Sequence, residues 1–118
     1  MRKIIYFDGS HDLKSLIDKC GYIWIFDTSL EYKWNLLNAE LCSDYIQKCS
    51  LFISIGDEAM HCERIVDDYI VSSEGKIFFP TIAEKDISNL LPLVAGWKSS
   101  ETVFLQTKNS LIKKNLVD

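Results

Sequence analysis

The sequence predicts a single α/β domain, doubly wound, with a mostly parallel sheet of about five strands and helices on both faces. Short apolar runs alternate along the chain with segments of helical period. One of these runs, Tyr22 to Phe26, is apolar on both faces, as expected of a central strand that helices cover on both sides. A chain of 118 residues has room for one domain, which we place over residues 1–118.

The first half of the chain contains three consecutive strand–helix units. Lys3 to Phe7 is the first expected strand, and a helix capped by Ser10 follows it and ends near Gly21. After the strand Tyr22 to Phe26, the pattern Thr28 to Glu31 predicts a capping box and the start of a second helix. Leu51 to Ile55 is the third strand, and a short helix then carries Ala59, Cys62 and Val66 on one stripe.

The second half gives weaker patterns. Two short apolar runs, Tyr69 to Val71 and Ile77 to Phe79, are candidate strands. Thr81 with Glu84 forms a second capping-box pattern, which predicts a helix that contains Pro92 and ends at Gly96.

The chain closes with a strand and a helix. We expect Thr102 to Leu105 to form the last strand, at an edge of the sheet, and Ser110 to Leu116 a small helix. The expected core comes from the first three strands and the second helix and contains Ile5, Phe7, Ile23, Trp24, Ile25, Trp34, Phe52 and Ile53.

Charge and cysteine content restrict the functional class. The formal net charge of −4 disfavours general binding to nucleic acid or to anionic membranes. No stretch approaches the roughly 20 apolar residues that a bilayer requires, and Asp8 interrupts the opening apolar run, so we expect no signal peptide. The cysteines lack CxxC spacing and lie in apolar segments, which predicts free thiols in a reducing cytoplasm. They are Cys20, Cys42, Cys49 and Cys62.

Carboxylates follow the first three expected strands. Asp8, Asp27, Asp57 and Glu58 should therefore meet at the carboxyl edge of the sheet, where α/β domains bind ligands. One interpretation is a magnesium site for phosphotransfer, because Mg²⁺ prefers oxygen ligands. The other is helix capping, because aspartate is favoured where helices begin. Size and alternation resemble a response-regulator receiver domain, but Gly9 stands where that family has the second carboxylate of its acidic pair.

Other catalytic patterns are missing from the sequence. Neither GxGxxG nor GxxxxGK[ST] occurs, so no nucleotide cofactor is expected. His61 and Cys62 are neighbours on a helix, where side chains diverge by about 100° and cannot form a thiolate–imidazole pair. His11 is the one candidate base near the carboxyl edge. We expect no catalytic residue, no metal and no cofactor.

Charge is distributed unevenly along the chain. Residues 57–74 carry six carboxylates against Arg64 alone, a net charge of −5, whereas residues 98–117 carry a net charge of +3. This predicts a surface that docks a basic partner. The partner-binding residues we expect are Asp57, Glu58, Glu63, Asp67 and Asp68, together with Asp8, Asp27 and the exposed anchor Trp97.

A small acidic domain without catalytic motifs resembles the immunity proteins of bacterial toxin systems, including contact-dependent inhibition. The resemblance implies a cytoplasmic protein that neutralises a cationic toxin, often a nuclease, by covering its active site with carboxylates. Two alternatives stay open. One is the magnesium-dependent or receiver-like domain, and the other is a regulatory or structural module that forms a homodimer through the edge strand Thr102 to Leu105.

Overall fold

The structure is a computed structural model that describes residues 21–96 and 102–112, and the backbone of residues 3–6. The helix expected after Ser10 lies outside the described residues, as do Asp8, Trp97 and most of the expected terminal helix. Residues 110–112 are helical. Of the expected core, Phe7 and the side chain of Ile5 also lie outside this description.

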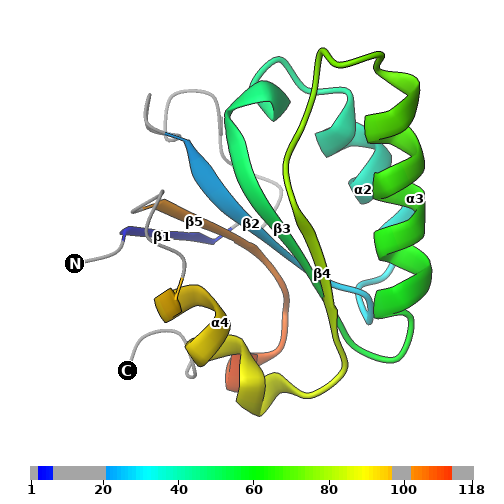
Figure 1. Cartoon of the computed structure of the whole chain (residues 1–118). Helices are drawn as coiled ribbons and strands as arrows, with labels where there is room; N and C mark the ends of the chain where they lie inside the picture. Colours follow the sequence, from blue (N-terminus) through cyan, green and yellow to red (C-terminus); the bar gives the residue numbers. More distant parts are fainter. Residues whose placement is uncertain (1–2, 7–20, 97–101, 113–118) are drawn as a thin grey trace.

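The described strands form one parallel sheet of five strands in the order β1-β5-β2-β3-β4 (Figure 1). The α/β class and the parallel sheet are therefore confirmed. The strands are β1 (Lys3–Tyr6), β2 (Tyr22–Asp27), β3 (Cys49–Ile55), β4 (Thr81–Glu84) and β5 (Thr102–Gln106).

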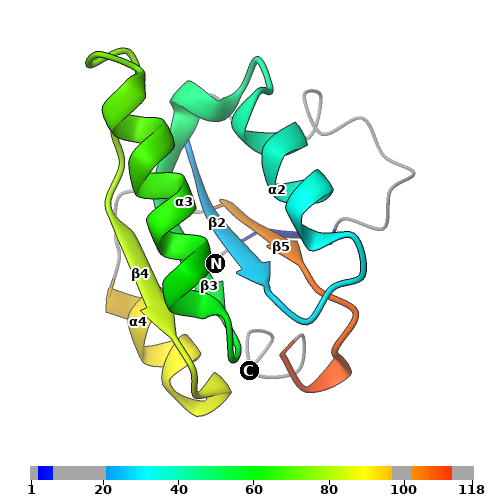
Figure 2. The ribbon, with the colours of Figure 1, turned by 90° about the vertical axis from the view of Figure 1, so that its right-hand side faces the viewer.

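Helices cover both faces of the sheet (Figures 1 and 2). Leu37 and Leu41 of α2 and Cys62 and Val66 of α3 pack on one face, while Leu90 of α4 packs on the other. The helices are α2 (Lys33–Leu41), α3 (Ala59–Ser72) and α4 (Leu90–Gly96), with 3₁₀ turns at Ile46–Lys48 and Ile87–Asn89. Within the described residues, no helix has the length and apolar character needed to cross a bilayer.

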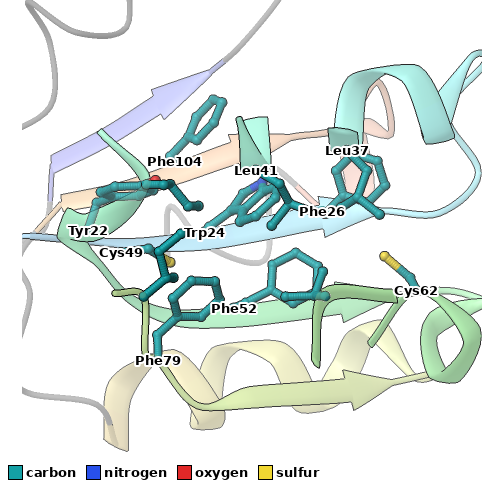
Figure 3. Close-up of a cluster of buried hydrophobic side chains, with 13 residues drawn as sticks. Tyr22, Trp24, Phe26, Leu37, Leu41, Cys49, Phe52, Cys62, Phe79 and Phe104 are labelled. Carbon is teal, nitrogen blue, oxygen red and sulfur yellow. The ribbon is translucent and has the colours of Figure 1, made fainter. Parts of the chain in front are cut away.

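The two faces of β2 differ in composition. Tyr22, Trp24 and Phe26 point toward α2 and α3 and form an aromatic layer with strand residues on either side (Figure 3). Ile23 and Ile25 point toward α4 and pack with aliphatic side chains. All five are buried, so the prediction of a central strand that is apolar on both faces is confirmed.

The last strand does not lie where the sequence predicted it. β5 pairs with β1 on one side and β2 on the other, so it lies inside the sheet and not at its edge. Every residue of β5 is buried, because both of its faces meet a helical layer and both of its sides meet a strand. A homodimer formed through Thr102 to Leu105 is therefore excluded, since the backbone groups of that strand are already paired.

The region after β3 also differs from expectation. Tyr69 to Val71 is the last part of α3 and not a strand, because Tyr69 and Ile70 continue the stripe that Cys62 and Val66 begin. Residues 77–79 form no strand, although Ile77 and Phe79 are buried in the aromatic layer. The fourth strand is β4, which begins at Thr81.

Neither expected capping box forms. The Thr28 hydroxyl donates to the Ile55 carbonyl at 2.7 Å and so ties the ends of β2 and β3 together. The helix α2 begins later, at Lys33, after Tyr32 in a left-handed conformation with φ 57°. Thr81 and Glu84 lie in β4, and the side chain that caps the following 3₁₀ turn is Asp86, which accepts from the Ser88 amide at 3.0 Å. Gly96 ends α4 as predicted.

Candidate functional site

The helix α3 and the loop before it carry five of the seven carboxylates expected to bind a partner. Its apolar stripe, Ala59, Cys62 and Val66, is buried against the sheet, which turns the remaining side chains outward. Asp67 and Asp68 are exposed and Glu63 is half-buried. Asp57 and Glu58, both exposed, immediately precede the helix. We call Asp57, Glu58, Glu63, Asp67 and Asp68 the acidic face.

Two members of the acidic face meet at the margin of the sheet. The Thr81 hydroxyl of β4 donates to an Asp67 carboxylate oxygen at 2.6 Å, and Glu63 lies near the same hydroxyl. Glu63 and Asp67 are one turn apart on α3 and lie on the same side of the helix. Partial burial and the neighbouring Asp67 charge raise the pKa of Glu63, and the nearby Thr81 hydroxyl opposes this rise. The two carboxylates therefore repel each other beside the Thr81 hydroxyl.

The opposite side of α3 faces α2. The His61 ring stands edge-on to Trp34, with the ring centroids 5.3 Å apart. The Lys33 ammonium lies 5.1 Å from the centre of the Trp34 ring and forms an ion pair with Glu58. One carboxylate of the acidic face is thus already neutralised by α2, whereas Glu63 and Asp67 lie toward β4.

A pocket opens between the ends of β2 and β3. Its volume is about 190 Å³, and it is lined by hydroxyl and charged groups from both loops. Gly56 lies at this place with φ 111°, and a Cβ there would stand 2.6 Å from the Thr28 hydroxyl oxygen. The close approach of the two loops therefore depends on glycine. The lining residues are Thr28, Ser29, Lys33, Asp57 and Glu58.

The prediction that Asp27 binds a partner was wrong, because this residue does not lie on the surface. Only 3% of the residue is exposed. Its carboxylate accepts from the Ser29 amide at 2.9 Å and the Ser29 hydroxyl at 2.7 Å. The other oxygen accepts from the Thr107 hydroxyl at 2.6 Å. Asp27 joins the carboxyl ends of β2 and β5, and both of its oxygens are occupied by the fold, so it cannot meet a partner.

The remaining candidates for chemistry are separated by the fold. Burial raises the pKa of the Cys62 thiol to about 12, which keeps it protonated, and its neighbour His61 points to Trp34. Cys49 is buried as well, and Cys42 is exposed; all three thiols are free. In the described residues, no group of three or more histidine, cysteine or acidic side chains is arranged to hold a metal ion.

Sequence reasoning missed Thr81 and Lys33. Thr81 organises the carboxylates of α3, but its spacing to Glu84 indicated a capping box. Threonine is also common in strands, and that preference was the signal for β4. Lys33 gave no signal of its own, because only the fold brings it to Glu58, which lies 25 positions later in the chain.

No protein-family model matches the chain, and neither the curated proteins nor the solved structures contain a match.

Proposed function

We propose that this chain is a non-catalytic protein-binding module that holds a basic protein partner on its acidic face. The observation that carries the proposal is the pair Glu63 and Asp67 around the Thr81 hydroxyl. Among the described residues, no lysine or arginine forms an ion pair with either carboxylate. A cationic side chain from a partner would relieve the repulsion between them and form charge-assisted hydrogen bonds.

The charge pattern also favours rapid association. Five carboxylates lie on one helix and the loop before it, with Arg64 as the one basic residue between positions 57 and 74. A concentrated field of one sign steers an oppositely charged protein toward the surface and raises the association rate at low salt. Specificity would come from the few ion pairs between the two proteins that are buried from water at the centre of the interface.

We further propose that the partner is a cationic toxin domain and that the chain is its immunity protein. The support is the resemblance in size, charge and lack of catalytic motifs, together with the exposed carboxylates of α3. Free buried thiols at Cys49 and Cys62 suit a reducing cytoplasm. Helices on both faces of a parallel sheet suit a doubly wound arrangement, in which the loop before α3, with Asp57 and Glu58, stands at the carboxyl edge.

The test uses charge reversal at two exposed positions. The variant Asp67→Lys/Asp68→Lys should keep the fold, because both side chains are exposed. Binding is measured by stopped-flow mixing with a small lysine-rich protein as the basic probe, at low and at physiological salt. We expect association at low salt to slow by about tenfold or more and the salt dependence to weaken.

The matched control is Glu31→Lys/Asp44→Lys, which makes the same change in net charge at two exposed positions outside the acidic face. If both double variants slow association equally, only net charge matters and the acidic face is not the binding surface. If neither slows association, the proposal fails.

A further inference from the structure

Among the described residues, the strand β4 has a strand partner on one side only. It pairs with β3 and stands last in the strand order, at the outer margin beside α3 (Figure 2). Each of its four residues is half-buried. The neighbouring Phe78 is 83% exposed. An edge with unpaired amide and carbonyl groups is a template for another strand.

The register shows which backbone groups of β4 face away from β3. The Pro80 carbonyl accepts from the Phe52 amide at 3.0 Å, and the Glu84 carbonyl accepts from the Gly56 amide at 3.2 Å. Successive residues of a parallel strand turn their amide and carbonyl groups to opposite sides. Pro80, Ile82 and Glu84 therefore face β3, whereas Thr81 and Ala83 direct their backbone groups away from the sheet.

The two faces beside this edge differ in chemistry. Ile82 packs with the aliphatic cluster under α4, so the side chains of Thr81 and Ala83 point to the α3 face. Thr81 there bonds to Asp67, on the side of α3 that is turned away from α2. A strand added beside β4 would therefore place alternate side chains near Glu63 and Asp67, and the others near Ile82.

We propose that the basic partner binds by adding an extended segment to β4, with basic side chains toward Glu63 and Asp67 and apolar side chains alternating with them toward the α4 face. This rests on the proposed function and names the way in which the partner is recognised. Backbone hydrogen bonds to Thr81 and Ala83 would supply affinity, and the alternating side chains would supply specificity. The occupant is a basic segment, because among the described residues neither Glu63 nor Asp67 forms an ion pair with a lysine or arginine.

A second copy of this chain fits the edge poorly. Pairing β4 with β4 of another copy would bring two Glu63–Asp67 pairs together, and like charges across an interface cost affinity. The strand is also short, and Pro80 and Lys85 flank it, which are features that discourage self-association of edges.

The test uses a short peptide in which lysine and valine alternate, with both ends blocked. A peptide of the same composition with all lysines before all valines is the sequence control. Binding to the isotopically labelled full chain is followed by NMR titration, with amide hydrogen exchange measured at Thr81 and Ala83. We expect the alternating peptide to bind more tightly than its control and to slow exchange at both amides by about tenfold or more.

Two N-methylated versions of the peptide test the backbone pairing without altering the protein. One carries the methyl groups on its lysine amides and the other on its valine amides. Because successive residues direct their amides to opposite sides, one version should lose about tenfold or more in affinity while the other changes little. Equal affinity of the two versions, or unchanged exchange at Thr81 and Ala83, overturns the inference.

A charge variant separates this inference from the proposed function. Glu63→Gln/Asp67→Asn should weaken the alternating peptide and leave the Thr81 and Ala83 amides in place. If this variant weakens both lysine peptides equally while exchange at the edge stays unchanged, the acidic face binds cations without strand addition. In that case the proposed function survives and the inference is wrong. If no lysine peptide binds the wild-type chain in a salt-dependent way, both fail.

Discussion

Glu40 is a carboxylate buried at the amino-terminal side of the sheet, in the last turn of α2. The Tyr45 hydroxyl donates to it at 2.5 Å, and the rings of Tyr45 and Tyr22 lie 6.1 Å apart. Loss of hydration raises the pKa of Glu40 above its ordinary value of 4.5, and the Tyr45 bond partly offsets that rise. The folded protein therefore holds a proton at Glu40 more tightly than the unfolded chain does.

This pKa gives a stability that depends on pH. Between 4.5 and the higher folded value, the native state binds more protons at Glu40 than the unfolded state, so stability falls as pH rises. Glu40→Gln removes the titrating group, and we expect its free energy of unfolding to fall less over the same range. Urea denaturation at several pH values measures the difference between the two proteins. If the free energy of unfolding changes with pH in the same way in the wild type and the variant, a raised pKa of Glu40 is contradicted.

Two threonine hydroxyls donate to carboxylates at the same distance but at different depths. Thr107 donates to the buried Asp27 at 2.6 Å, and Thr81 donates to the exposed Asp67 at 2.6 Å. We expect Thr107→Val to destabilise the fold by about 1–3 kcal/mol, because a buried carboxylate loses its donor. Thr81→Val should cost under about 0.5 kcal/mol, because water replaces the bond. Urea denaturation of both variants tests this; equal losses would show that burial of Asp27 is unimportant.

The burial of a single side chain could be predicted from the sequence where the residue lies in a long apolar run, as Trp24 and Ile25 do. Asp27 could not be predicted in this way. Its type and its place after a strand indicated a surface carboxylate, whereas in the fold one of its oxygens accepts from Thr107, 80 positions away in the chain. Such a partner is fixed by the tertiary fold and leaves no local pattern.

At the scale of elements, a strand was predicted well where its environment was uniform, and helix limits were predicted poorly. β2 was expected because both of its faces are apolar. The predicted start of α2 was wrong, because the Thr28 hydroxyl donates to the Ile55 carbonyl and is therefore not available to cap the helix. The predicted end of α3 was wrong, because the short apolar run Tyr69 to Val71 is compatible with a strand as well as with the buried stripe of a helix.

Two turn glycines provide a matched pair for testing the contact between loops. Gly56 has φ 111° and a built Cβ would stand 2.6 Å from the Thr28 hydroxyl, whereas Gly75 has φ 88° and open space around it. Both Gly→Ala changes strain the backbone, by about 1–2 kcal/mol each. Gly56→Ala should cost more, because it also displaces the Thr28 hydroxyl. Thermal unfolding compares the two, and equal shifts in Tm would mean that the loops move apart freely.

The whole molecule depends on long-range pairing that the sequence does not display. The last strand along the chain, β5, lies between the first two, β1 and β2. The alternation of strands and helices predicted the parallel class, but it could not place β5, because any of several strand orders satisfies short right-handed crossovers. The acidic face was predictable because its members are close in sequence, whereas its link to β4 through Thr81 depended on the strand order.

The internal position of β5 predicts how two phenylalanines differ. Phe104 on β5 is fully buried in the aromatic layer, beside Tyr22 with ring centroids 6.3 Å apart, whereas Phe78 is 83% exposed. Phe104→Ala should therefore cost about 3–5 kcal/mol, because it opens a cavity at the centre of the sheet. Phe78→Ala should change stability by less than about 0.5 kcal/mol, because the side chain gains little from folding. Urea denaturation measures the free energy of unfolding of both variants. If Phe104→Ala lowers it as little as Phe78→Ala does, the interior position of β5 is contradicted.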